Sequence, residues 1–389
     1  PDYGFLITMT RYLMNRAREI ALPKGRCKDP NADANPGEIT GMRGLVGSMS
    51  WATREGMPYG AGDTSILAST LPQPKVKDLQ EANAALRRLK QNDVPIRIRP
   101  IPLVRLRLLL FADSSLGNAK GGSSQLGHLL CSVDKSIFDG KEADCSALIW
   151  KSHKMRRAGA NTLFCESNGL SEGLGHCEWV ASWIGLAKDL NYDLRRRGTL
   201  NREIQVTAIM KEPEGDLTMA AITDAKSLYD VANQEQYAHI DKRAALEICV
   251  IKDSLDQLGG KVKWVPHQEN PADCMSKLKG NAVRLLQLLK TARYRLISEE
   301  TELKQRKDFR DTTGKRNPRP NKSVDIDDNV DTQYYFLQDE PEPVAGTSFG
   351  LGFICTADLH LQDNSLHLEA HDDIHSQAFF RDLSDTPPA

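Results

Sequence analysis

Four acidic residues stand where a carboxylate rarely occurs without a reason: Asp113, Glu166, Asp224 and Asp273. Two of them follow apolar segments, one shares the apolar face of a predicted helix, and one lies where a helix is expected to begin. Buried carboxylates are usually paired, hydrogen-bonded or bound to a cation. Oxygen ligands suit Mg²⁺ or Mn²⁺, and two such ions roughly 3.5–4 Å apart stabilise both charged oxygens in phosphodiester hydrolysis. The set therefore indicates a two-metal nuclease site.

Asp113 and Asp224 each follow a predicted strand. Residues 104–112 become apolar at every position, which is typical of a central strand covered on both faces. Asp113 is expected to end this strand before a turn, and Asp224 follows a second predicted strand, 217–223, ahead of a helix at 226–234. Either aspartate alone is as readily a turn former as a ligand. Because open α/β sheets place their sites at the carboxyl ends of strands, we expect the two side chains to meet.

Helical periodicity distinguishes Glu166 from the acids around it. Residues 162–190 are predicted to form one helix, capped by Asn161. Glu166 lies on the apolar face of this helix, whereas Glu172, about half a turn away, is expected to face water. A buried acid needs a partner, and a metal cation is the simplest one. The apolar face consists of Leu163, Leu170, Leu174, Cys177, Ala181 and Ile184.

Asp273 is placed differently, at the start of a predicted helix that runs from 272 to 296. Asn270 suits the cap of this helix and Pro271 its first turn. Alone, Asp273 is more simply explained as an acid that complements the helix dipole. His267 lies six residues before Asp273. This histidine either assists proton transfer or is a bystander.

The order of these motifs resembles the type 1 RNase H domain of retrotransposon polyproteins, in the copia/Ty-like branch of reverse transcriptases. Any one block is weak evidence, but several independent blocks follow the family's order. Residues 43–54 and 78–90 also resemble the thumb and connection region that joins a copia-type polymerase to its RNase H domain. The blocks of the nuclease part are Phe111 to Asn118, Gly122 to His128, Ile149 to Arg157, Cys165-Glu166-Ser167, Asp224 to Leu228, and Trp264 to Asp273.

The resemblance implies an α/β fold in which a mixed five-stranded, RNase H-like sheet is flanked by helices. This domain is expected at 103–300, after a poorly patterned lead-in at 1–40 and a mostly helical thumb/connection-like region at 41–100. The charged stretch 189–215 is interpreted as a surface insertion. Residues 301–389 are polar and acidic, a composition that predicts a disordered tail.

As for function, the resemblance implies an endoribonuclease that cleaves the RNA strand of RNA/DNA hybrids with two Mg²⁺ or Mn²⁺ ions. In this family's scheme Asp113 bridges the two ions, Glu166 and Asp224 each bind one side, and Asp273 completes the second site. The implied partners are the hybrid and the rest of the Pol polyprotein, including the polymerase palm and integrase. The palm is missing, because no pair of adjacent aspartates has the strand-turn-strand setting it needs. The chain starts at Pro1 and is expected to be a processed product or a fragment.

Charge is segregated along the chain although the net charge is −1. Residues 323–389 hold one basic residue and fourteen acids, so the basic residues concentrate in the part that precedes the tail. Phosphate contacts supply most of the affinity of proteins for nucleic acid. A cluster beside the predicted site is therefore a candidate surface for nucleic acid, although a solvated strand end explains it equally well. The candidates are Lys151, His153, Lys154, Arg156 and Arg157, together with Ser114 beside the first aspartate.

Cysteine spacing gives no indication of zinc, because the eight cysteines include no C-x-x-C pair. No signal peptide is apparent, and no apolar run is long enough to span a bilayer. We therefore expect an intracellular, reduced setting in the cytoplasm or nucleus, without a membrane partner.

Two other function classes remain open at this point. A DDE-type integrase or transposase shares the fold, but its essential glutamate comes last in the chain, whereas Glu166 here comes second. That order disfavours strand transfer. The other alternative is a catalytically decayed or co-opted element that keeps the fold and binds nucleic acid or a protein.

Overall fold

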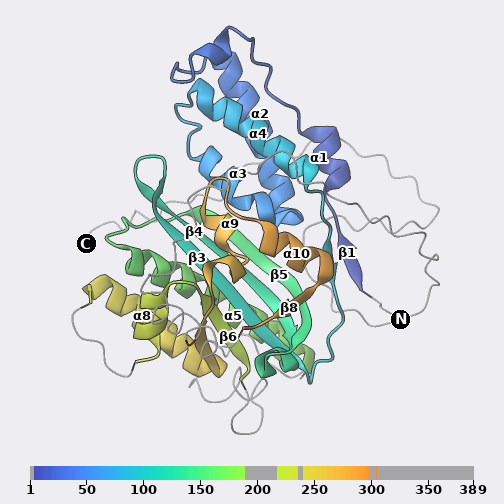
Figure 1. Cartoon of the computed structure of the whole chain (residues 1–389), viewed down its shortest axis with the longest axis vertical. Helices are drawn as coiled ribbons and strands as arrows, with labels where there is room; N and C mark the ends of the chain where they lie inside the picture. The colour runs from blue at the N-terminus through green and yellow to red at the C-terminus, as the bar shows by residue number, and fades with distance from the viewer. Residues whose placement is uncertain (1–3, 189–216, 235–239, 298–303, 305–389) are drawn as a thin grey trace, which may run out of the picture. The chain divides into compact units, whose positions relative to one another are not determined.

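A mixed six-stranded sheet lies at the centre of the computed structural model, which describes residues 4–188, 217–234, 240–297 and 304 (Figure 1). All of them belong to one compact unit, residues 1–351, and the second unit, 352–389, lies outside the described residues. The order across the sheet is β7-β6-β3-β4-β5-β8. The strands are β3 (Leu106–Ala119), β4 (Ser123–Asp134), β5 (Glu142–Lys154), β6 (Met219–Thr223), β7 (Gly260–Trp264) and β8 (Arg293–Arg295).

The strand directions confirm the predicted RNase H-like class. β3, β4 and β5 form an antiparallel meander, and β6 then returns beside β3 in parallel, with Phe111 opposite Ile222. β7 continues the parallel half beside β6. The predicted number of five strands was one too low, because β8 adds an antiparallel edge strand to β5, with Tyr294 opposite Ala143.

The prediction that the first strand ends at Asp113 is wrong. β3 continues to Ala119, and Asp113 pairs with Gly127 of β4 in the middle of the hairpin. The hairpin reverses later, at Gly121 and Gly122, whose φ angles of 76° and 71° favour glycine. The parallel neighbour β6 does end at Thr223, so Asp113 still lies at the edge where the parallel pairing stops.

Helices α5 (Thr162–Lys188), α7 (Lys226–Ala232) and α8 (Lys242–Leu258) pack on one face of the sheet. Asn161 caps α5 as predicted, because its Oδ1 accepts a 2.8 Å hydrogen bond from the backbone N–H of Phe164. Alternate β3 residues point to this face, where they pack against the apolar side of α5. This core includes Leu108, Leu110, Leu170, Leu174, Ile248 and Ile251.

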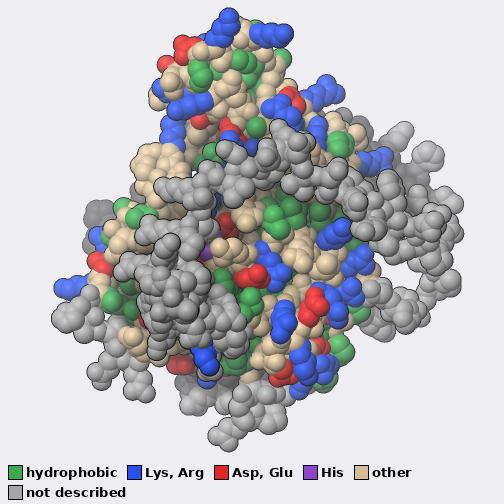
Figure 2. All heavy atoms as spheres, viewed as in Figure 1, with side chains coloured by type: hydrophobic (Ala, Val, Ile, Leu, Met, Phe, Trp, Pro, Cys, Tyr) green, Lys and Arg blue, Asp and Glu red, His purple; other side chains and the backbone are tan. Residues whose placement is uncertain are grey.

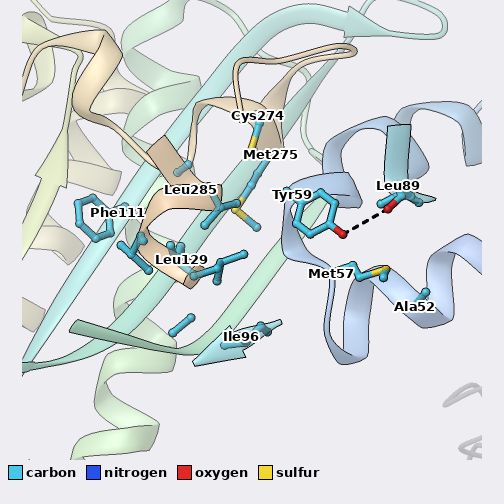
Figure 3. Close-up of a cluster of buried hydrophobic side chains, with 14 of the residues drawn as sticks. Ala52, Met57, Tyr59, Leu89, Ile96, Phe111, Leu129, Cys274, Met275 and Leu285 are labelled. Carbon is cyan, nitrogen blue, oxygen red and sulfur yellow. Dashed lines mark hydrogen bonds between the residues drawn. The ribbon is translucent and has the colours of Figure 1, made fainter. Parts of the chain in front are cut away.

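The opposite face is covered by helices from before and after the central strands β3 to β5, which agrees with the mostly helical region predicted before the sheet. The earlier helices are α2 (Pro36–Glu55), α3 (Ala61–Ala68) and α4 (Val76–Gln91). Figure 3 shows Phe111 and Leu129 of the sheet together with Met275, Leu285 and Tyr59 of the covering helices, all in one continuous buried cluster. Ahead of these helices come β1 (Phe5–Ile7) and α1 (Thr10–Arg16), and β1 pairs with β2 (Ile96–Ile98).

The predicted helix from 272 to 296 is wrong. The segment instead forms α9 (Asp273–Ser276), α10 (Val283–Thr291) and β8. The break has a local cause: Lys279 adopts a left-handed φ of 56°, and a Cβ on Gly280 would lie 2.5 Å from the Cα of Cys274. The chain therefore folds back on α9 too closely for a continuous helix.

Two predicted segments lie almost entirely outside the described residues: the charged insertion at 189–215 and the acidic tail at 301–389. Within the described part, no helix combines the length and apolar character needed to cross a membrane.

Candidate active site

Four structural elements bring the predicted acids to one edge of the sheet. Asp113 lies in β3, Glu166 in α5, Asp224 directly after β6, and Asp273 at the first position of α9. Asp113, Glu166 and Asp273 are only 3%, 6% and 4% exposed. The burial predicted for Glu166 from helical phase is thus confirmed.

Two basic side chains link three of these acids. His267 Nδ1 lies 2.5 Å from Oδ2 of Asp224, and its Nε2 lies 3.0 Å from Oδ1 of Asp273. Lys277 Nζ lies 3.3 Å from Oδ2 of Asp113 and also forms an ion pair with Asp273. Asp113, Asp224 and Asp273 therefore share one connected group of charges.

Electrostatics place Glu166 in the same group. Burial raises the pKa of Glu166 well above its usual value, and repulsion from Asp113 and Asp224 raises it further. Burial, followed by repulsion from Asp224, likewise raises the pKa of Asp113 to about 8, although the nearby Lys277 ammonium opposes the shift. The acids thus destabilise one another's charged forms, as expected when carboxylates are gathered at one place.

The pKa of His267 is raised as well, but for an imidazole a raised pKa favours the charged form. Its hydrogen bond to Asp224 and the charge of Asp273 raise the pKa of the imidazole above its ordinary value, and partial burial opposes them. The protonated imidazole donates from both nitrogens and can bind both carboxylates at once. These two contacts place His267 among the acids.

Asn270 contributes in a way that its sequence position did not predict. It was expected to cap the helix of Asp273, but Ala272 occupies the cap position of α9. The buried Asn270 amide instead donates to the Ala112 carbonyl oxygen at 2.9 Å and to Oδ1 of Asp224 at 3.3 Å. Its own Oδ1 accepts from the backbone N–H of Ala272 at 3.1 Å. Asn270 thus connects β3, the Asp224 carboxylate and the start of α9.

Ser276 and Lys277 were also not predicted as members of the site. Both reach Asp113: the Ser276 hydroxyl donates a hydrogen bond to its carboxylate, and Lys277 forms the ion pair described above. They follow Asp273 by three and four residues, which is one helical turn and places them on the same side of a helix. The spacing of three and four residues from Asp273 is the sequence pattern from which their contact with the site could have been predicted.

The donor atoms of the four acids suit a hard divalent cation, because all are carboxylate oxygens in a buried, mutually repelling group. Among the described residues, no set of three or more carboxylate, imidazole or thiolate groups is arranged to hold a metal ion as it stands. Lys277 and His267 take up carboxylate oxygens of three of the acids. Metal binding at this edge therefore requires these two side chains to give up some of their contacts.

The predicted nucleic-acid surface is more neutral than the sequence indicated. His153 Nε2 and Lys151 Nζ of β5 lie 2.8 and 3.6 Å from Oε2 of Glu172. Glu172 was expected to face water, but its side chain is only 34% exposed because it packs against these two strand residues. Arg157 similarly binds Glu247 at 2.5 Å. Lys151, His153 and Arg157 are thus paired with acids, and Ser114 is buried. Lys154 and Arg156 are exposed and form no ion pair with the described residues.

The face drawn in Figure 2 also carries positive and negative side chains mixed together. Lys and Arg side chains are spread over it in small groups, with Asp and Glu side chains between them. On this face, the described residues therefore do not form one uninterrupted basic surface.

No family model and no curated protein matches the chain. Solved structures that are similar to it include the following three. The N-terminal RNase H domain of Rv2228c from Mycobacterium tuberculosis, fused to maltose-binding protein, is 14% identical; the match covers 44% of this chain and 91% of that chain, with a TM-score of 0.27. RNase H1 from Halobacterium salinarum is 11% identical over 44% of this chain and 94% of its own, with a TM-score of 0.28.

The third is a foamy viral protease-reverse transcriptase in complex with an RNA/DNA hybrid. It is 11% identical, and the match covers 46% of this chain and 20% of that chain, with a TM-score of 0.26. At such identities and TM-scores these likenesses carry no argument about the chemistry of this chain. The RNase H-like fold rests on the order and directions of the strands themselves.

Proposed function

We propose that this chain is a ribonuclease H-type endonuclease that hydrolyses the RNA strand of RNA/DNA hybrids. One observation carries the proposal: four acids from four separate elements gather at one edge of an RNase H-like sheet, where burial and repulsion from other acids of the set raise the pKa of Asp113 and Glu166. Such an arrangement costs folding free energy, and perturbed acids cluster at functional sites more often than elsewhere.

Two divalent cations, Mg²⁺ or Mn²⁺, would be held by Asp113, Glu166, Asp224 and Asp273, and would stabilise charge on the attacking and leaving oxygens of a phosphodiester. The protein's own groups have distinct tasks. Asn270 fixes the orientation of Asp224 through its amide, and Ser276 fixes that of Asp113 through its hydroxyl. His267 is placed to hold or release a proton beside Asp224 and Asp273.

The order of the acids supports hydrolysis over strand transfer. Glu166 comes second and an aspartate comes last, whereas DDE-type integrases place the glutamate last. The motif resemblance further supports an origin in a copia/Ty-type retrotransposon Pol polyprotein. In that setting the helices α2 to α4 correspond to the thumb and connection region, and the polymerase palm and integrase would be partners.

For the substrate, Lys154 at the end of β5 and Arg156 two residues later are exposed cations that precede α5. They are proposed to contact phosphates, and Lys151, His153 and Arg157 would do so after exchanging their acid partners for nucleic acid.

A cleavage assay tests the proposal. The chain is incubated with Mg²⁺ or Mn²⁺ and a labelled RNA strand in three forms: paired to DNA, single-stranded, and paired to RNA. The expected result is metal-dependent cleavage of the hybrid that an Asp113→Asn variant lacks. Hybrid binding without cleavage above that variant would instead identify the decayed or co-opted binding module.

A further inference from the structure

The loop that follows α9 is fastened to the helical region that precedes the nuclease strands. The backbone N–H of Lys279 donates a 2.7 Å hydrogen bond to Oδ1 of Asp63 in α3. The Lys279 ammonium lies 2.7 Å from Oε2 of Glu81 in α4. Arg88 of α4 bridges the two acids, with its Nη2 2.5 Å from Asp63 and 2.8 Å from Glu81. Residues more than 190 positions apart thus form one charged network.

The contact between α3 and α9 is also very close. A Cβ added to Gly62 would lie 2.2 Å from the carbonyl oxygen of Cys274 and 3.0 Å from that of Lys277. These clashing atoms belong to backbone, so no side chain can move aside to relieve them. Gly62 is therefore required for α3 to approach the segment that carries Asp273.

The side of α9 that faces the sheet also requires a glycine at the point of contact. A Cβ on Gly127 of β4 would lie 2.6 Å from the Cβ of Met275. Gly127 pairs with Asp113 in the sheet, so α9 rests on the strand pair that carries the first acid. Figure 3 shows Cys274 and Met275 in the cluster that lies between the sheet and Tyr59 of the helical region. Gly127 and Gly62 thus allow β4 and α3 to approach α9 closely from its two sides.

We propose that α3 and α4 act as a brace that holds α9 against β3 and β4, so that Gly62 and Asp63 are positioning residues for Asp273 and Lys277. The proposal deepens the proposed function, because it assigns part of the nuclease site's geometry to the region before the nuclease domain. The physical reason is that α9 has only four residues and cannot hold its own conformation. Its backbone position must come from contacts on both sides.

Thiol labelling of the full chain tests the brace without relying on nuclease activity. Cys274 in α9 is buried and labels only when this segment opens, whereas Cys131 in β4 is buried in the sheet and reports global unfolding. Cys249 on α8 is exposed and serves as the internal standard. Alkylation at each site is followed by peptide mass spectrometry.

Asp63→Ala removes the acceptor of the Lys279 N–H and the partner of Arg88. We expect Cys274 to label about tenfold faster or more, the effect of losing one charge-assisted hydrogen bond, with Cys131 unchanged. Asp63→Asn keeps an acceptor oxygen for the Lys279 N–H and should restore most of the protection. Asp256→Ala, at an exposed position of α8, is the matched control and should change neither thiol.

Gly62→Ala should have a larger effect at Cys274 than Asp63→Ala. Its matched control is Gly44→Ala in α2, where an added Cβ meets no atom within 4 Å. Unchanged Cys274 labelling in Asp63→Ala and Gly62→Ala, or an equal rise at Cys131, would overturn the brace. These results stand whether or not the wild-type chain cleaves a hybrid. If it does, Asp63→Ala should lower hybrid cleavage while Asp63→Asn restores it, as expected of a positioning residue.

Discussion

Lys277 Nζ lies 3.3 Å from Oδ2 of Asp113, on a side chain that follows Asp273 by one helical turn. The protein thus supplies a cation of its own to two of the four acids. Since the ammonium is mostly buried between them, its removal leaves like charges without compensation.

We therefore predict that Lys277→Met lowers the free energy of unfolding without metal by about 1–3 kcal/mol, the usual cost of leaving a buried charge unpaired. Adding Mn²⁺ should stabilise this variant more than the wild type, because the ion then replaces the missing ammonium. Urea unfolding with and without Mn²⁺ measures both effects. Lys290→Met, at an exposed position of α10, is the control. Equal stabilisation of both variants by Mn²⁺ would argue against a shared place for Lys277 and metal.

The raised pKa of Asp113 predicts how stability depends on pH. With a folded-state pKa of about 8 and an unfolded value of about 4, the native chain holds a proton between these values that the unfolded chain has lost. Stability from this group therefore falls as pH rises from about 4 to 8, by at most about 1.4 kcal/mol per pH unit. Asp113→Asn removes this dependence, so without metal its stability relative to the wild type should increase across this window. Chemical denaturation at several pH values tests the sign, and a constant difference would contradict it.

The raised pKa of His267 predicts a second dependence of stability on pH. Because its pKa is raised in the folded chain, its link to Asp224 and Asp273 contributes fully below about pH 6.5 and is lost as pH rises through the folded-state pKa. The stability lost in His267→Gln should thus be largest at acidic pH and shrink above neutrality.

His176 on α5 supplies the matched control, because burial and then the charge of Lys151 lower its pKa. A lowered histidine pKa makes the folded state less stable as pH falls, so His176→Gln should relieve this cost and show the opposite slope. The same slope in both variants would contradict the assignment of His267 to the acidic site.

Local patterns were sufficient to predict the burial of Glu166 and the strand that ends just before Asp224. Glu166 was found because a long helix with one apolar face fixes which of its residues point inward, and this information lies within a few turns. Asp224 was found because it follows a short apolar strand and precedes a helix. The class of the sheet followed from the same periodicities and from the resemblance.

The contacts between the acids could not be predicted in this way. Lys277 and Asn270 bind Asp113 and Asp224, which lie far away in sequence and meet them only through the fold. The prediction of one long helix from 272 to 296 was wrong for a related reason. Its apolar residues have helical spacing, but Gly280 folds back against Cys274, and that close tertiary contact outweighs local propensity.

The most direct test of the central claim compares two glutamates of one helix, Glu166 and Glu172, as Glu→Gln variants in the RNA/DNA hybrid cleavage assay. Glu166 lies buried among the acids, whereas Glu172 lies outside them and binds His153 and Lys151 of β5. Metal ligation is worth several kcal/mol in such reactions, so Glu166→Gln should lose at least about hundredfold in rate. Glu172→Gln should remain within about tenfold of the wild type, as expected for a surface pair. Comparable rates for Glu166→Gln and the wild type would contradict the proposed nuclease site.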